Sequence, residues 1–142
     1  MAEDTQRSVA IERTSLGRYR ADNVRGGSIS FGVGGDSDFT PVELLLAAIG
    51  GCTAADVDHI TVKRAEPDTF TVTVSGDKVR DETGNHMTNL AVTFHVSFPD
   101  GTAGDAARDM LPQAVARSHD RLCTVSRTVE SGAKVQSQIA SE

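Results

Sequence analysis

The stretch "TPVELLLAAIGGCTAADVDHI" (residues 40–60) carries the strongest helix signal in the chain. Thr40 suits the N-cap, Pro41 suits the first helical position, and Glu43 can return a hydrogen bond to the cap, as in a capping box. Apolar residues then recur every three or four positions, which is the spacing of one helix face. This pattern predicts a helix from Pro41 to Lys63 or Arg64, ended by the proline that follows shortly after.

Gly50 and Gly51 lie inside this helix, directly before Cys52 on its apolar face. Glycine within a helix costs about 0.5–1 kcal/mol relative to alanine, so a close contact should compensate for the pair. The first half of the helix is also apolar almost all round, as expected of a helix buried on more than one side. We therefore predict that another backbone, typically that of a second helix, packs against the glycines, and that the helix lies in the middle of a homodimer.

The rest of the chain predicts an α+β domain. Alternation of apolar and polar residues predicts strands over residues 8–14, 18–24, 28–33, 70–79 and 88–98, the last two joined by a long polar turn. A second helix is expected over residues 103–122, with a kink at Pro112 or a restart capped by Asp109. Two short strands around Gly132 are expected to end the chain, and residues 1–142 are interpreted as a single domain.

Composition narrows the class of partner. The formal net charge is −6 and aromatic residues make up 4% of the chain, so we expect neither nucleic acid nor a membrane as a partner. No uninterrupted apolar run approaches the ~20 residues of a membrane span. The first ten residues, "MAEDTQRSVA", have acidic residues where a signal peptide needs a basic run followed by an apolar one. These features predict a cytoplasmic protein.

The two cysteines, Cys52 and Cys123, are the candidate reactive residues. In the cytoplasm they are expected to be free thiols, a redox pair or metal ligands rather than a structural disulfide. Burial alone would leave Cys52 inert, since it raises the pKa of a thiol. Lowering that pKa from ~8.5 to ~5.5 takes about 4 kcal/mol, which one cation about 4 Å away supplies.

The helix dipole cannot supply this charge, because Cys52 lies well beyond the first turn, and Asp56 on the same face opposes ionisation. A reactive Cys52 therefore needs an arginine from another part of the chain. The candidates are Arg18, Arg20, Arg25 and Arg127.

A zinc site is the alternative use of these residues, with Cys52 and His59 from one helix and His119 and Cys123 from another. The chain has no CxxC or HxxxH pair, so we expect neither a metal nor a cofactor. A cysteine hydrolase is disfavoured as well, since no nucleophile elbow accompanies either thiol.

The segments "TPVELLLAAIGGCTAADV" (residues 40–57) and "AVARSHDRLCTVSRTV" (residues 114–129) resemble the osmotically inducible protein C and organic hydroperoxide resistance (OsmC/Ohr) family. The resemblance covers essentially the whole chain and is closer to the OsmC-like branch than to the best-understood peroxidases. It implies an OsmC-like fold with two antiparallel sheets, two main helices, a central first helix and an intertwined homodimer.

The resemblance also implies a thiol peroxidase that reduces organic hydroperoxides and protects against oxidative or osmotic stress. Cys52 would be the peroxidatic cysteine, and Cys123 would resolve its sulfenic acid to a disulfide that an external dithiol reduces. Arg25 matches the activating arginine best. Glu43 would hold it, although Val42 occupies the family's glutamate position and Glu43 lies about 180° round the helix from Cys52. The alternative is a dimer that binds a small hydrophobic molecule in an apolar pocket.

Overall fold

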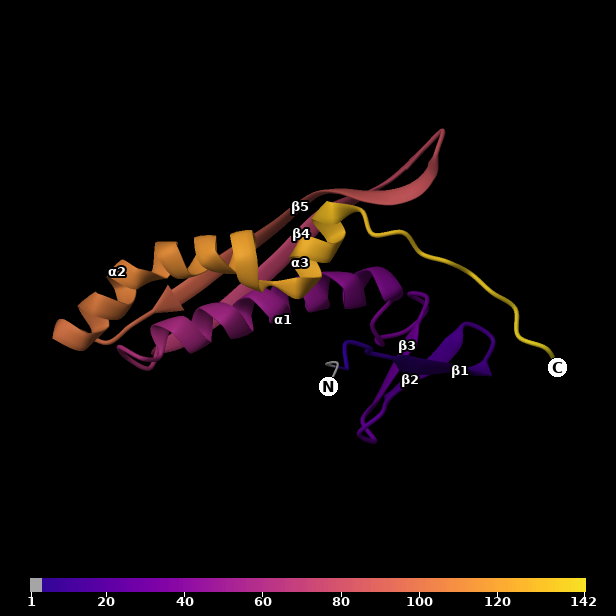
Figure 1. The fold of residues 1–142 in the computed structure, drawn as a ribbon, viewed down its shortest axis with the longest axis horizontal. Helices are drawn as coiled ribbons and strands as arrows, with labels where there is room; N and C mark the ends of the chain where they lie inside the picture. Colours follow the sequence, from indigo (N-terminus) through magenta and orange to yellow (C-terminus); the bar gives the residue numbers. More distant parts are fainter. Residues whose placement is uncertain (1–3) are drawn as a thin grey trace. The chain divides into compact units, whose positions relative to one another are not determined.

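The computed structural model describes residues 4–142, so the first three residues of the segment used to predict the absence of a signal peptide lie outside the described part. The chain divides into two compact units, Met1–Leu45 and Leu46–Glu142. Three strands precede a long helix, and a two-stranded hairpin and further helices follow it (Figure 1). The predicted α+β class is confirmed, with two antiparallel sheets.

The first unit contains a three-stranded antiparallel sheet in the order β1-β2-β3. Its strands are β1 (Val9–Ser15), β2 (Arg18–Asn23) and β3 (Ser28–Gly32), as the alternating pattern predicts. Ile11, Ala21 and Ile29 stand in register on one face. Ile11 is 61% exposed and Ile29 is 55% exposed, so this face is apolar and largely uncovered.

Helix α1 (Pro41–Thr61) begins with the predicted capping box. The Thr40 N–H donates to Glu43 Oε1 over 2.8 Å, and the Glu43 N–H donates to Thr40 Oγ1 over 3.2 Å. The helix ends at Thr61, slightly earlier than predicted, because the Arg64 N–H bonds to the Thr61 carbonyl and tightens the chain into a turn.

Strands β4 (Thr69–Asp81) and β5 (Gly84–Ser97) form a hairpin that is longer than the apolar alternation indicates. Most of the expected polar turn is strand, because polar residues stay paired as far as Asp81 and Gly84. Only two residues make the turn, and Gly84 at φ 116° adopts a conformation that glycine favours. The apolar face of the hairpin is half-buried and includes Val72, Val74, Val92 and Phe94.

The two glycines of α1 have different surroundings. A Cβ on Gly50 would lie 2.4 Å from Val74 Cγ2, whereas a Cβ on Gly51 would meet nothing within 4 Å. The close contact predicted for Gly50 therefore exists, but a strand side chain of the hairpin makes it and not a second helix. The homodimer remains a prediction.

Helix α2 (Thr102–Arg117) runs through Pro112 without a restart at Asp109. The irregularity comes later, where the π-helix η1 (Ser118–Leu122) continues the chain as far as Cys123. A π-turn of this kind adds a residue to the turn and is frequent at functional sites.

The prediction of two terminal strands is wrong. The segment after Cys123 forms helix α3 (Thr124–Ser131), with Cys123 as its N-cap and Gly132 at φ 65° as its C-cap. Val125 and Val129 are four residues apart, which suits one helical face as well as it suits a strand. The two caps therefore decide the structure, and residues 133–142 have no regular secondary structure.

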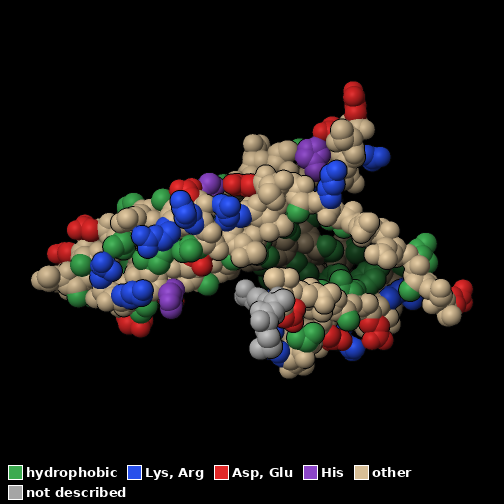
Figure 2. Space-filling model, in the orientation of Figure 1, with side chains coloured by type: hydrophobic (Ala, Val, Ile, Leu, Met, Phe, Trp, Pro, Cys, Tyr) green, Lys and Arg blue, Asp and Glu red, His purple; other side chains and the backbone are tan. Residues whose placement is uncertain are grey.

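Helix α1 is also long and apolar enough to cross a membrane by length and composition, with a window of mean hydropathy 1.2. A core helix of a soluble protein passes the same test. The contact of Gly50 with Val74 shows that α1 packs on its own hairpin. Acidic and basic side chains are interspersed on the face that Figure 2 shows, including the part over α1 and α2.

Candidate functional site

The fold brings the two cysteines together within the second unit. Cys52 comes from the middle of α1, and Cys123 from the junction of η1 and α3. The two Sγ atoms and a carboxylate oxygen of Asp56 all lie within 4.8 Å of one another. Both thiols are free. A disulfide needs an S–S separation of about 2.05 Å, so the two sulfur atoms must approach further to be joined.

A hydrogen-bond chain buried beside the thiols fixes η1 against α1. Ser118 Oγ donates to Asp56 Oδ2 over 2.9 Å, which leaves Thr53 Oγ1 as the donor in its 2.8 Å contact with Ser118 Oγ. The Ser118 carbonyl in turn accepts the Cys123 N–H over 2.8 Å. Ser118 has no exposed surface, so its hydroxyl is a structural link between Asp56 and the segment that carries Cys123.

The Cys123 thiol is buried at the start of α3 and has donors around it. Its Sγ accepts the Ser126 N–H over 3.4 Å and lies 3.3 Å from Ser126 Oγ. Burial raises the pKa of Cys123, but the hydroxyl and N–H of Ser126 and the Cys52 thiol outweigh it and hold this pKa below its ordinary value. The N-terminal end of a helix favours the thiolate in the same way.

The half-buried Cys52 has the opposite tendency. Burial raises the pKa of its thiol, and although the Val125 N–H lowers it, Cys123 and the negative charge of Asp56 raise it further. The effect of Asp56 is the one predicted from its place on α1. In the reduced pair the proton therefore stays on Cys52, and Cys123 is the thiol that ionises more readily.

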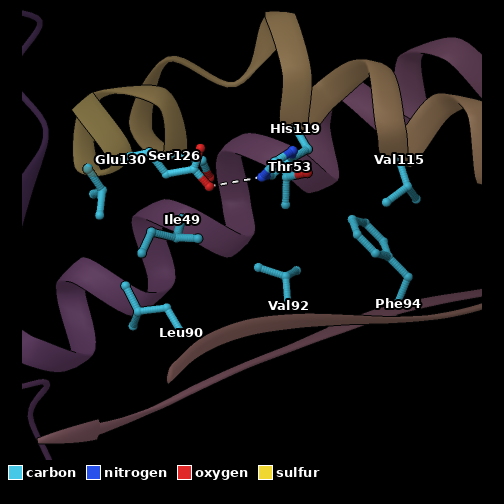
Figure 3. Close-up of a pocket in the computed structure, with 10 residues that line it drawn as sticks. Ile49, Thr53, Leu90, Val92, Phe94, Val115, His119, Ser126 and Glu130 are labelled. Atoms are coloured by element: carbon cyan, nitrogen blue, oxygen red, sulfur yellow. Dashed lines mark hydrogen bonds and ion pairs between the residues drawn. The ribbon is translucent and has the colours of Figure 1, made fainter. Parts of the chain in front are cut away.

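An apolar pocket of about 290 Å³ lies beside α1 (Figure 3). Its lining comes from α1, β5, α2, η1 and α3, and consists of Ile49, Thr53, Leu90, Val92, Phe94, Val115, His119, Ser126, Val129 and Glu130. Two of these residues connect it to the cysteines. Thr53 follows Cys52 in the chain, and Ser126 contacts Cys123 Sγ. One polar pair lines the pocket as well, since His119 Nε2 lies 2.9 Å from Glu130 Oε1.

The other predicted residues have partners or surroundings of their own. Glu43 acts in the capping box of α1, and a catalytic role for it stays a prediction. Arg18 pairs with Asp36, Arg20 pairs with Glu12 and Asp22, and Arg127 donates to the Asp120 carbonyl. Arg25 forms no ion pair with any of residues 4–142 and belongs to the first unit, so its proposed action on Cys52 also stays a prediction.

The four residues considered from the sequence as zinc ligands, Cys52, His59, His119 and Cys123, do not come together as one cluster. His119 bonds to Asp120 and Glu130, and His59 is not part of the cluster around the thiols. The third ligand beside Cys52 and Cys123 is Asp56, four residues after Cys52 on α1. That spacing placed Asp56 on the face of Cys52, but nothing in the sequence indicates the partners Ser118 and Ser126.

Comparisons with known proteins agree with the fold. The family model described as OsmC-like protein matches residues 34–138. An uncharacterised protein of Mycobacterium tuberculosis is 30% identical over 131 residues, which cover 91% of this chain and 93% of the relative.

Two solved structures show the same fold. An OsmC-like protein of unknown function from Vibrio cholerae has a TM-score of 0.73 at 15% identity, over 89% of this chain and 94% of that one. The organic hydroperoxide resistance protein OhrB of Bacillus subtilis has a TM-score of 0.55 at 17% identity, over 87% of this chain and 90% of that one.

Proposed function

The chain belongs to the OsmC-like family, and from its paired thiols we propose that it is a thiol peroxidase that reduces organic hydroperoxides through a Cys52–Cys123 disulfide. The observation that carries the proposal is the approach of both free Sγ atoms and the Asp56 carboxylate to within 4.8 Å. The neighbour named for organic hydroperoxide resistance supports the substrate class. Protection against oxidative or osmotic stress would be the cellular role.

Cys52 is the thiol that a peroxide can reach, because it is half-buried whereas Cys123 has no exposed surface. Cys52 Sγ attacks the terminal peroxide oxygen, the O–O bond breaks, and the products are a Cys52 sulfenic acid and an alkoxide that takes up a proton to become the alcohol. Cys123, the thiol that ionises more readily, accepts the Cys52 proton in its thiolate form during this attack.

Cys123 then attacks the sulfenic sulfur, and a disulfide and water result. The overall change is two thiols and one hydroperoxide to one disulfide, one alcohol and one water. An external dithiol restores both thiols by disulfide exchange.

The apolar pocket would hold the organic group of the hydroperoxide. Its volume of about 290 Å³ and its lining by Val92, Phe94 and Val115 suit an alkyl or aryl substituent better than hydrogen peroxide. The same pocket supports a second candidate function, which is the binding of a small hydrophobic molecule without turnover.

Two parts of the proposal rest on the family and the sequence. A homodimer would cover the apolar sheet face around Ile11 and Ile29. Arg25 would supply the positive charge that Cys52 lacks, with Glu43 as its carboxylate partner. A cytoplasmic location, where dithiol reductants are available, suits this chemistry.

Intact-mass spectrometry with thiol counting tests the proposal, before and after one equivalent of cumene hydroperoxide. The wild type should lose two hydrogens and both thiols. Cys123→Ser should stop at a sulfenic acid that a dimedone-type trap labels, and Cys52→Ser should remain reduced. If both thiols survive the oxidant in the wild type while a hydrophobic dye still binds, the binding function replaces the peroxidase.

A further inference from the structure

The cluster that joins the thiols contains a third group that disulfide chemistry does not use. Asp56 contributes a carboxylate oxygen within 4.8 Å of both sulfur atoms, and Ser118 holds that carboxylate over 2.9 Å. Among residues 4–142 no Lys or Arg forms an ion pair with Asp56. Three groups that can each carry a negative charge therefore meet without a cation.

We propose that Cys52, Cys123 and Asp56 form a binding site for one Zn²⁺ ion in the reduced protein. Two thiolates and one carboxylate are ligands that zinc accepts, with a fourth position left to water. Bonds of about 2.3 Å to sulfur and about 2.0–2.2 Å to oxygen place tetrahedral ligand atoms roughly 3.5–3.8 Å apart. The observed limit of 4.8 Å requires movements of about an ångström.

The surroundings already orient these ligands. The Ser126 N–H donates to Cys123 Sγ, and Ser118 Oγ donates to Asp56. Such outer hydrogen bonds fix the direction of metal ligands and are worth about 10- to 100-fold in affinity. Binding of the metal releases the protons of the thiols and involves no oxidation.

The site exists only while the thiols are reduced. A Cys52–Cys123 disulfide removes both sulfur ligands, so oxidation and zinc binding exclude each other. Bound zinc would hold the thiols apart and delay their oxidation, whereas oxidation would release the metal. This exclusion does not depend on which oxidant forms the disulfide.

Zinc titration of the reduced protein against a chromogenic chelator tests the proposal, with Co²⁺ as a spectroscopic probe. We expect one metal per chain and a thiolate-to-cobalt charge-transfer band. Asp56→Asn keeps a hydrogen-bond acceptor for Ser118 but removes an anionic ligand, so it should weaken binding by more than the roughly 10- to 100-fold that loss of an outer hydrogen bond costs. Asp58→Asn removes the same charge from an exposed position of α1 outside the cluster and should have no effect.

Cys52→Ser and the oxidised wild type should both lose the site. The proposal is overturned if the reduced protein binds no zinc, if Asp56→Asn and Asp58→Asn bind it equally, or if the oxidised protein binds it as tightly as the reduced one. Circular dichroism of each variant checks that it is folded. Because metal binding is measured directly, a failure of peroxidase activity leaves this result unchanged.

Discussion

The Sγ atoms of the two cysteines lie within 4.8 Å of each other, yet the two thiols occupy different positions in their helices. Cys123 begins a helix, where the N–H groups of the first turn have no partner within the helix, and the Ser126 N–H bonds to its sulfur. Cys52 lies in the middle of α1, where the backbone donors are already used by the helix. The pKa of Cys123 is lowered and that of Cys52 is raised.

Position along a helix therefore decides which thiol of a close pair ionises first. Burial acts in the same direction on both, since it raises each pKa. The difference comes from the groups around each sulfur. The hydroxyl and N–H of Ser126 lower the pKa of Cys123, whereas for Cys52 the Val125 N–H is outweighed by burial, Cys123 and Asp56. Cys52, the thiol that a peroxide reaches, is thus the weaker acid. It needs Cys123 or a nearby cation to help it lose its proton.

The largest effect is expected where α1 is held against the hairpin, since this contact positions Cys52. A Cβ on Gly50 would lie 2.4 Å from Val74 Cγ2, so Gly50→Ala should destabilise the fold by about 1–3 kcal/mol through overpacking. The displaced helix should also slow formation of the Cys52–Cys123 disulfide. Urea unfolding and the rate of thiol loss under peroxide measure the two effects.

Gly51→Ala is the matched control, because its Cβ would meet nothing within 4 Å. It should stabilise the helix by about 0.5–1 kcal/mol from propensity alone. Equal free energies of unfolding for the two variants would show that the contact of Gly50 with Val74 is not tight. That contact could then not be what positions Cys52.

This contrast also shows what the sequence could predict. The capping box of Thr40 and Glu43 is a local signal, and both of its hydrogen bonds are present. The glycine pair indicated a close contact but not its partner, because the identity of a neighbour such as Val74 depends on how the hairpin packs. Local signals therefore located the helix, and tertiary packing decided what it touches.

The C-terminal part was predicted less well for a related reason. Cys123 was recognised as a candidate reactive residue, but its role as the N-cap of α3 was missed, because cysteine is not among the usual capping residues. Without that cap, the alternation in "TVSRTVE" was interpreted as a strand. Ser126, three residues after Cys123, gave no warning either, because the residues that usually bond back to the cap from that position are Glu and Gln.

A smaller effect is expected from the cap itself. In a Cys52→Ser background, which leaves one thiol, Ser126→Ala removes the hydroxyl beside Cys123 Sγ and keeps the backbone N–H. A hydrogen bond to a charged group contributes about 1.5–3 kcal/mol, so the pKa of Cys123 should rise when the hydroxyl is removed. The pH dependence of thiolate ultraviolet absorbance measures it.

Ser131→Ala, at the other end of α3, serves as the comparison, since Ser131 Oγ bonds only to the Thr128 carbonyl. It should leave the pKa of Cys123 unchanged. An equal pKa in the two variants would mean that the Ser126 hydroxyl does not lower the pKa of Cys123 and does not distinguish the two cysteines.

The smallest effect concerns the contact between η1 and the far end of α3. Asp120 and Glu130 raise the pKa of His119, which lies on the Cys123 side of the site. Because the folded state favours the protonated form, the contribution of His119 to stability is fully present below its ordinary pKa of about 6.5 and is lost as the pH rises through the higher folded value. His119 is 59% exposed, so the change should be small.

Thermal unfolding between pH 5.5 and 8.5 measures this dependence, with His119→Gln expected to remove it and His95→Gln, on an exposed position of β5, to retain it. Loss of the ion pair should loosen the pocket wall formed by Glu130 and the first turn of α3, which Cys123 caps, while α1 keeps its contact with the hairpin at Gly50. As the pH rises, the rate of thiol labelling at Cys123 should therefore increase by more than the growing fraction of Cys123 thiolate explains. If the labelling rate at Cys52 increases by the same factor, α1 and α3 loosen together. The difference between the two cysteines is then confined to the hydrogen bonds at their sulfur atoms.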